Sequence, residues 1–252
     1  MKIFLSAVEG SAPRDALIKV MKEKKLKYNL MSFYYIKDRN NLEFSKIIRD
    51  NSEVVIIDSG AHSLQKGKKV DWVSYTNEYA QFIKEFDTEN VVGYFEMDVD
   101  NIIGYEKVLE LRKILESVSN KIIPVWHKNR GIDEYKKMCR DYAGKVIAIT
   151  GFKNEDIKDD QYLMFLKYAK KYNCRVHCLG MTRKKVLDKV PFDYVDSSSW
   201  LQHIVYGRTL KGEKLPRARN SKDRESQYYH NYLLGMKMQE DYYNKWRKVC
   251  KD

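Results

Sequence analysis

Three aspartates in this chain each follow a short apolar run, and carboxylates placed in this way could do acid–base and nucleophilic chemistry. Asp58 ends the run EVVIID and leads into Ser59 and Gly60, Asp98 ends VVGYFEMD, and Asp196 ends FDYVD. Carboxylates that share a pocket shift one another's pKa values, so one can act as a nucleophile while another serves as an acid or base. The pattern therefore predicts one site built from several strand ends.

Other polar, small or aromatic residues follow further apolar runs. They are Glu96, Asp100, Trp126, His127, Thr150, Gly151, His177, Leu179 and Gly180. Some have a structural alternative: Asp100 could be a helix cap or turn former, and His177 could be a hydrogen-bonded core histidine. Their shared position nevertheless predicts a pocket lined by carboxylates, small residues and an aromatic ring.

Such a pocket requires parallel strands whose carboxyl ends meet on one face. Eight apolar runs are interpreted as strands, at 2–7, 29–36, 53–58, 91–98, 121–126, 145–150, 174–179 and 192–196. Continuous runs of this kind suit strands that are covered on both faces. Amphipathic stretches at 71–86, 101–118 and 159–172 are interpreted as helices between them. The alternation predicts an α/β fold, a (β/α)8 TIM barrel, with a doubly wound open sheet as its rival.

The length of 252 residues suits a single barrel domain. We expect residues 1–205 to form the barrel core and residues 206–252 to complete it. Within the second part, 206–224 is basic and contains Gly and Pro, which predicts a loop. Residues 225–248 are aromatic and basic and are predicted to form a closing helix.

Composition limits the classes of function. The formal net charge of +12 favours a polyanionic partner, although a solvated lysine-rich surface would give the same balance. No apolar run is long enough for a membrane helix, and the apolar start of the chain is interpreted as a first strand, not a signal peptide. The four cysteines lack CxxC spacing, which argues against a zinc ribbon and suits a reducing cytoplasm. We therefore expect a cytoplasmic protein.

Over residues 50–200 the chain resembles the tRNA-guanine transglycosylase superfamily, especially its short phage and DNA-modifying relatives. The family segment DSGGFQ is similar to DSGAHS at 58–63, and FDSAAY is similar to VDSSSW at 195–200. The base-recognising aspartate of the family falls on Asp98. If the chain is phage-encoded, the cytoplasm in question would be that of the host.

The resemblance implies base exchange, in which guanine leaves its ribosyl carbon and a free 7-deazaguanine base replaces it. Asp196 would be the nucleophile that holds the sugar covalently, with Asp193 as the alternative. Asp58 would be the general acid and base, and Asp98 would accept hydrogen bonds from the base. The implied reaction needs no metal or cofactor.

The resemblance also suggests the residues that contact the substrates. The base site would contain Ser59, Gly60, Asp98, Trp126, His127, Gly151, Leu179 and Gly180. An aromatic platform of Tyr94, Phe95 or Trp126 would stack on a flipped base. Arg208, Arg217 and Arg219 would contact the nucleic acid.

The chain departs from the family in ways that leave its substrate open. The zinc motif CxCxxC is absent, and Trp126-His127 replaces a glutamine of the recognition strand. The missing zinc motif, the short chain and the phage-type resemblance favour DNA over tRNA as the polymer, and a partner protein could be required. Two other classes stay open. One is a metal-dependent hydrolase using His62, His127, His177 and Asp196. The other is a catalytically inactive nucleic-acid-binding module.

Overall fold

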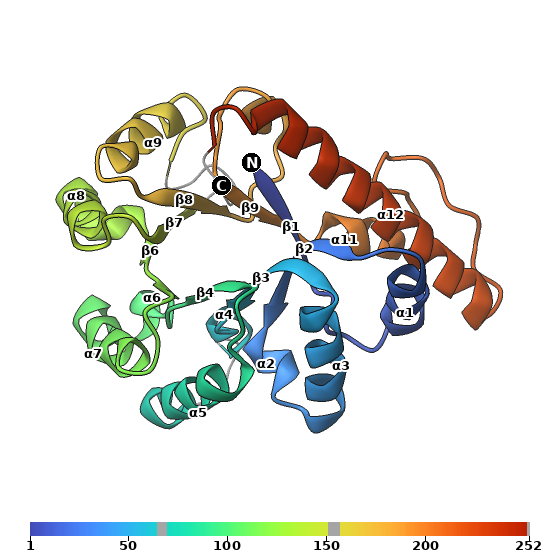
Figure 1. The fold of residues 1–252 in the computed structure, drawn as a ribbon, viewed down its shortest axis with the longest axis horizontal. Coiled ribbons are helices and arrows are strands. Elements are labelled where there is room, and N and C mark those ends of the chain that lie inside the picture. Colours follow the sequence, from blue (N-terminus) through green and yellow to red (C-terminus); the bar gives the residue numbers. More distant parts are fainter. Residues whose placement is uncertain (65–69, 151–156, 251–252) are drawn as a thin grey trace.

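Parallel strands surrounded by helices form a nearly closed barrel (Figure 1). The computed structural model describes residues 1–64, 70–150 and 157–250. Strands and helices alternate along the chain, which confirms the predicted (β/α)8 fold and excludes the open sheet as the better description. None of the described helices is both long and apolar enough to cross a bilayer.

The elements have the following bounds. The strands are β1 (Lys2–Ser6), β2 (Leu26–Ser32), β3 (Ser52–Asp58), β4 (Val91–Phe95), β5 (Ile122–Ile123), β6 (Val125–Trp126), β7 (Val146–Thr150), β8 (Arg175–Leu179) and β9 (Tyr194–Ser197). The helices are α1 (Arg14–Glu23), α2 (Phe33–Ile36), α3 (Arg39–Asp50), α4 (Ala61–Leu64), α5 (Trp72–Phe86), α6 (Asp100–Ile103), α7 (Tyr105–Glu116), η1 (Lys128–Arg130), α8 (Gly131–Asp141), α9 (Tyr162–Lys170), α10 (Lys184–Leu187), α11 (Ser199–Val205) and α12 (Ser221–Trp246).

The two edges of the barrel sheet come together at Pro124. The strand order is β5-β4-β3-β2-β1-β9-β8-β7-β6, so β5 and β6 are the two edges of the sheet. They are also the two halves of a single apolar run, divided by Pro124, which has no N–H for the ladder. The Pro124 carbonyl accepts from Ala148 N of β7 at 2.9 Å. One short run therefore joins β4 to β7, although each half is a strand of only two residues.

Three predicted boundaries were wrong. The strand expected at 29–36 ends at Ser32, because residues 33–36 form α2, with Phe33 and Ile36 buried against neighbouring helices. Phe, Tyr and Ile also favour strands, so this run looked like a continuation. The strand expected at 91–98 ends at Phe95. The helix expected at 101–118 is divided into α6 and α7 by Gly104, whose φ is 82°.

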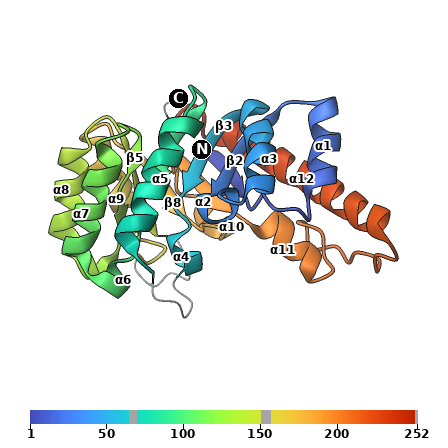
Figure 2. The ribbon, with the colours of Figure 1, turned by 90° about the horizontal axis from the view of Figure 1, so that it is seen from below.

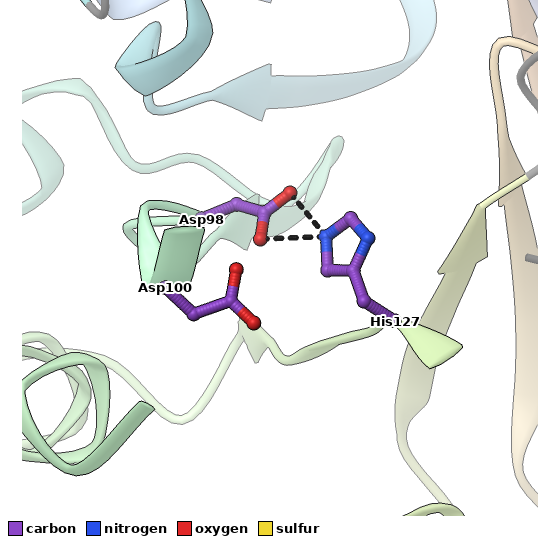
Figure 3. A group of neighbouring side chains, drawn as sticks. All are labelled: Asp98, Asp100 and His127. Atoms are coloured by element: carbon purple, nitrogen blue, oxygen red, sulfur yellow. Dashed lines mark hydrogen bonds and ion pairs between the residues drawn. The ribbon is translucent and has the colours of Figure 1, made fainter. Parts of the chain in front are cut away.

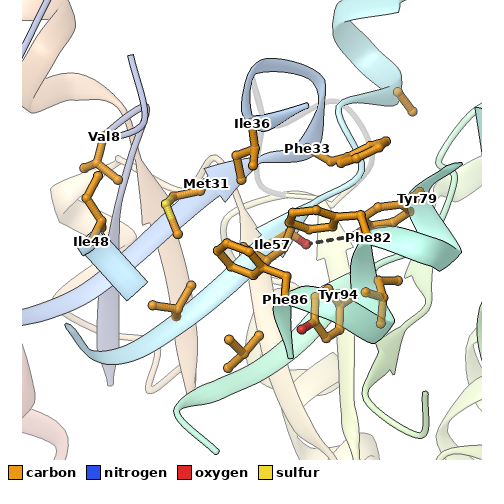
Figure 4. Packing of buried hydrophobic residues seen from close by; sticks show 14 of the residues in the cluster. Val8, Met31, Phe33, Ile36, Ile48, Ile57, Tyr79, Phe82, Phe86 and Tyr94 are labelled. Atoms are coloured by element: carbon orange, nitrogen blue, oxygen red, sulfur yellow. Dashed lines mark hydrogen bonds between the residues drawn. The ribbon is translucent and has the colours of Figure 1, made fainter. Parts of the chain in front are cut away.

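Alternating side chains of the strands separate the barrel interior from the helix layer. Ile56 belongs to the interior cluster, and Ile57 belongs to the cluster beneath the helices. Figure 4 shows this outer layer, in which Tyr79 of α5 donates to the Ile57 carbonyl at 3.3 Å. Phe82 and Phe86 stack beside it, with ring centroids 4.6 Å apart. The same alternation turns Asp58 to the interior side at the end of β3.

The C-terminal helix α12 packs against β1 and β2. The buried side chain of Gln239 donates to the carbonyls of Ile3 and Tyr28, at 2.8 and 2.6 Å. The Asn231 amide donates to the Trp200 carbonyl at 2.7 Å, which ties α12 to α11. Figure 2 shows α11, α12 and α1 together on one side of the barrel. Helix α12 begins at Ser221, so residues 221–224, which were predicted to belong to the loop 206–224, are helical.

Candidate active site at the carboxyl ends of the strands

Asp58 ends β3 at the carboxyl face of the barrel. Its Oδ2 accepts from Gly60 N at 2.9 Å and from Ser32 Oγ at 3.5 Å. Burial raises the pKa of Asp58 to about 6, and the negative charges of Asp196 and Asp98 contribute to this increase. Three predicted aspartates therefore act on one another electrostatically, and Asp58 can exchange a proton near neutral pH.

The turn after Asp58 requires glycine at position 60. Gly60 has φ +74°, and a Cβ there would lie 2.3 Å from Tyr34 Cβ and 2.8 Å from Tyr34 N. Glycine lets the turn lie against α2 while its N–H points at Asp58. Ser59 is buried, and its carbonyl accepts from Tyr75 Oη at 2.9 Å. Both residues thus shape the turn that holds Asp58.

Asp196 lies at the carboxyl end of β9 with its two oxygens in different surroundings. Oδ1 bonds to His177 Nε2 at 2.9 Å and accepts from Gly180 N at 3.0 Å. Oδ2 has one long contact, from Ser6 Oγ at 3.5 Å. Gly180 has φ 62°, and Leu179 before it packs against the barrel-interior cluster. The carboxylate is held through one oxygen and open at the other.

Asp193, the alternative nucleophile, lies before β9 begins and thus at the amino end of that strand. Its Oδ2 accepts from Val176 N at 2.8 Å, and the residue is 6% exposed. The length of β9 therefore separates Asp193 from the face that carries Asp196. This geometry favours Asp196 as the residue that could act together with Asp58.

Asp98 forms an ion pair with His127 where β4 and β6 end (Figure 3). His127 Nε2 lies 2.8 Å from each Asp98 oxygen, and Arg130 Nη2 donates to Asp98 Oδ1 at 3.3 Å. Burial lowers the pKa of His127, but the hydrogen bond and charge of Asp98 outweigh it, and the pKa is raised. The Asp98 carboxylate thus lies between the His127 imidazole and the Arg130 guanidinium.

One group of side chains could in principle hold a metal ion. Among the described ranges, Asp98, Asp100 and His127 form the group of metal-ligand type whose donor atoms lie within 4.8 Å of one another. Asp100 Oδ2 already accepts from Arg130 Nε at 3.0 Å and from Asn129 Nδ2 at 3.1 Å. A divalent cation would compete with the Arg130 guanidinium for these carboxylates. Of the residues in the hydrolase alternative, His177 Nε2 contacts Asp196 Oδ1 at 2.9 Å, whereas His127 Nε2 contacts Asp98.

Of the three residues predicted as an aromatic platform, Trp126 and Tyr94 face the helix layer instead of the barrel interior. The Trp126 ring packs between barrel and helices against Tyr135 and Phe165, at centroid distances of 5.7 and 5.1 Å. The alternation explains this, since Val125 faces the interior and Trp126 must face outwards. Tyr94 also belongs to the outer layer, and Phe95 is buried in the interior.

Besides Tyr75 of α5, Tyr34 of α2 lies near the Asp58 turn. Tyr34 contacts the turn at Gly60, and the Tyr35 ring lies 5.0 Å from the Tyr34 ring and is 48% exposed. Sequence reasoning missed both tyrosines, because residues 33–36 looked like the end of a strand.

Four further predicted site residues are Gly151 and the arginines at 208, 217 and 219. Gly151 falls outside the described residues, and Thr150 before it ends β7. Arg208, Arg217 and Arg219 are exposed on the segment between α11 and α12. The Arg208 guanidinium donates to the Gly212 carbonyl at 3.4 Å, within its own segment.

Glu9 is a further acidic residue at this face, and sequence reasoning missed it. It is 2% exposed, Oε1 accepts from Ser32 N at 3.2 Å, and Oε2 has no hydrogen-bond partner among the described residues. Burial raises its pKa to about 7, and the charge of Asp58 contributes. The turn after β1 that brings it here contains Ala7 at φ 62°. Its position shortly after the first predicted strand was the feature of the sequence that could have identified Glu9 as a site residue.

The pKa of Glu9 predicts how stability depends on pH. Because the folded value of about 7 exceeds the ordinary value of 4.5, its stabilising effect is complete below pH 4.5 and is lost as pH rises through 7. We therefore compare the free energy of unfolding of Glu9→Gln with that of wild type at each pH. This difference should shift by about 3 kcal/mol in favour of the variant between low pH and pH 8. Urea denaturation of both proteins at pH 4.5 and pH 8 measures this. A difference that is the same at both pH values would contradict it.

Comparison with protein-family models gives no match for this chain, and no curated protein is significantly similar to it in sequence. Its activity therefore has to be inferred from the chemistry of the strand-end site. The segments DSGAHS and VDSSSW add the resemblance described above.

Proposed function

We propose that the protein is a nucleic-acid guanine transglycosylase that exchanges guanine for a 7-deazaguanine base in DNA. The observation that carries the proposal is the pair of carboxylates in unlike surroundings at one end of the barrel. The pKa of Asp58 is raised to about 6, so this carboxyl group can carry a proton close to neutral pH. The Asp196 carboxylate is held by two hydrogen bonds that Oδ1 accepts. Carboxyl groups separated in this way are suited to different roles in one reaction.

In the first displacement Asp196 acts on the sugar. Oδ2 attacks the anomeric carbon from the face opposite the base, which forms a C–O bond as the N-glycosidic bond breaks. The electron pair of the broken bond leaves with guanine, and Asp58 donates its proton to that base. The products of this step are free guanine, ionised Asp58 and a sugar covalently bound to Asp196.

The second displacement reverses the roles. The incoming 7-deazaguanine loses a ring proton to the Asp58 carboxylate and attacks the anomeric carbon, and the bond to Asp196 breaks. Asp58 is protonated again, so the cycle consumes no proton and needs no cofactor. A pKa near 6 suits a group that must both give and take a proton near neutral pH. Two inversions retain the configuration of the sugar.

Asp98 is proposed to select the base. A carboxylate can accept from both the N1–H and the exocyclic amine of guanine, a pairing that adenine does not offer. His127 Nε2 contacts both Asp98 oxygens and Arg130 Nη2 donates to Oδ1, and these contacts orient the carboxylate. Trp126 faces the helix layer, so stacking on the flipped base is proposed for Tyr34 and Tyr35 of α2 instead.

The polymer would be bound by the basic segment between α11 and α12. Arg208, Arg217 and Arg219 are exposed there, together with Lys211 and Lys214. Tyr206, at the end of α11, is 77% exposed. Exposed cations beside an exposed aromatic ring suit a nucleic-acid backbone with an unstacked base. DNA is preferred because the chain lacks the zinc motif that in the tRNA-acting family members supports tRNA binding.

The basic segment gives a prediction about affinity. Replacing Arg217 and Arg219 together by alanine should weaken binding to DNA about tenfold at low salt and reduce the slope of log affinity against log salt by about 2. The matched control replaces Lys24 and Lys25, which are exposed at the amino end of β2, and should leave both quantities nearly unchanged. Fluorescence anisotropy with a labelled oligonucleotide measures them. Equal losses in both double variants would indicate an effect of net charge alone.

The activity itself is tested with radiolabelled guanine. The protein is incubated with the label and either duplex DNA, single-stranded DNA or bulk tRNA, and label in each recovered polymer is counted. Label in DNA supports the proposal. Label in tRNA alone would keep the base-exchange reaction but change the substrate from DNA to tRNA. Label in no polymer, with enzyme shown to bind DNA, would contradict the transferase assignment. Metal analysis of the same sample tests the hydrolase alternative.

A further inference from the structure

We propose that His177 is a positioning residue that locks the Asp196 carboxylate with Oδ1 held and Oδ2 directed at the reacting carbon. The inference rests on the proposed function, because it assigns the attacking atom. It also makes a statement about the free protein that can be tested without any substrate.

The His177 ring is enclosed within the barrel directly beneath Asp196. The residue is 0% exposed. Its ring meets Phe95 edge-on at a centroid distance of 5.0 Å, and Phe4 and Tyr194 lie at 6.0 and 6.3 Å. Three aromatic neighbours from different strands thus fix the ring plane. Only Nε2 reaches a carboxylate, at 2.9 Å from Asp196 Oδ1.

The surroundings of the other ring nitrogen fix the tautomer. His177 Nδ1 is buried and has no hydrogen-bond partner among the described residues. A proton on Nδ1 would be a buried donor without an acceptor. An unprotonated Nδ1 would be a buried acceptor without a donor, which costs less free energy. The proton therefore belongs on Nε2, where Asp196 accepts it. In this tautomer His177 is a fixed donor to one oxygen of the proposed nucleophile.

This donor determines which oxygen can attack. Gly180 N also donates to Oδ1, so rotation of the carboxylate would break two hydrogen bonds at once. Oδ2 keeps only the 3.5 Å contact with Ser6 Oγ and has the lone pairs needed for attack. Holding the reacting atom in one orientation lowers the barrier without changing how tightly the substrate binds. The expected signature is a loss in kcat with little change in KM.

A purely structural histidine would give a different pattern. If His177 only filled space between aromatic rings, an apolar side chain of similar size could replace it without loss of rate. If it acts as a donor, glutamine should rescue the rate, because its Nε2 amide is separated from Cα by the same number of bonds as His177 Nε2. Substituting leucine and glutamine at one position therefore separates packing from hydrogen bonding.

The experiment compares His177→Leu, His177→Gln and the control His203→Leu. His203 is a partly buried histidine whose Nδ1 bonds to the Thr209 carbonyl, away from Asp196. The leucine variant at 177 should lose about 10- to 100-fold in kcat for base exchange with KM nearly constant. The glutamine variant should recover to within a few-fold of wild type, and the control should keep its rate. A folded His177→Leu protein with full rate would overturn the proposal.

Nitrogen-15 NMR of the free protein provides a readout that does not depend on catalysis. The proposal requires the His177 tautomer with the proton on Nε2, and Asp196→Ala should perturb the Nε2 resonance more than that of Nδ1. A proton found on Nδ1 would overturn the inference even in an active enzyme. If wild type exchanges no base but shows the Nε2–H tautomer, the proposed function fails while the Asp196–His177 contact stands.

Discussion

Replacing Asp196 by asparagine is expected to abolish the covalent adduct with nucleic acid and to lower the rate of base exchange by about ten-thousand-fold or more. An asparagine side chain keeps the shape and can still accept from His177 and Gly180 through its amide oxygen. What it lacks is the anionic oxygen that attacks the sugar. The loss should thus appear in kcat, while affinity for DNA stays close to that of wild type.

Asp193→Asn is the matched control for this variant. It changes the same type of side chain beside the same strand, but at the amino end, where an asparagine oxygen can still accept from Val176 N. We expect it to retain adduct formation and exchange. The measurement is denaturing electrophoresis of enzyme mixed with labelled oligonucleotide, together with incorporation of labelled guanine. An active Asp196→Asn enzyme would refute the nucleophile assignment, and loss of adduct only in Asp193→Asn would transfer the role.

The fold could be predicted from sequence because its strands are buried on both faces. Apolar runs such as EVVIID are continuous, and polar residues come where each run ends. The same rule is enough to locate Asp58 and Asp196 at strand ends, and Asp98 shortly after one, from the order of residues alone. It was less successful at boundaries, as at Phe33–Ile36, where the same residue types suit a strand or a buried turn of helix.

The parts of the site that were missed depend on contacts between distant segments. Glu9 belongs to the site because a turn after β1 brings it to Ser32 of β2, and nothing near Glu9 in sequence specifies that partner. Trp126 was placed in the pocket by its position in a motif, but the strand alternation turns it outwards. Likewise, the His177 contact with Asp196 depends on β8 and β9 being neighbours in register.

The junction between β4 and β6 shows how side chains support a barrel where its backbone ladder is shortest. Because β5 and β6 have two residues each, few ladder hydrogen bonds are formed there. Glu96 Oε1 accepts from Val125 N at 2.7 Å, which supplies an acceptor across the junction. Arg130, just after β6, donates to the Val125 carbonyl and reaches Glu96 at 3.2 Å. Side-chain charges thus tie the two edges together.

Arg130 is central to this junction, and its removal should be costly. Its side chain is 1% exposed and pairs with Glu96, Asp98 and Asp100, while its guanidinium lies 4.4 Å from the Tyr105 ring centroid. Arg130→Met keeps much of the side-chain volume but removes the positive charge that balances the buried carboxylates. We expect the free energy of unfolding to fall by about 3–5 kcal/mol. Urea denaturation near neutral pH measures this loss.

Two further variants separate charge from geometry at position 130. Arg130→Lys keeps a cation but cannot reach three carboxylates with one planar group, so its stability should lie between wild type and Arg130→Met. Lys136→Met removes an exposed partner of Asp133 and should have no measurable effect. If Arg130→Met were as stable as Lys136→Met, the junction would not depend on this charge. Because Arg130 also holds Asp98, the folded Arg130→Lys enzyme should show a raised KM for the base, which links closure of the barrel to recognition of guanine.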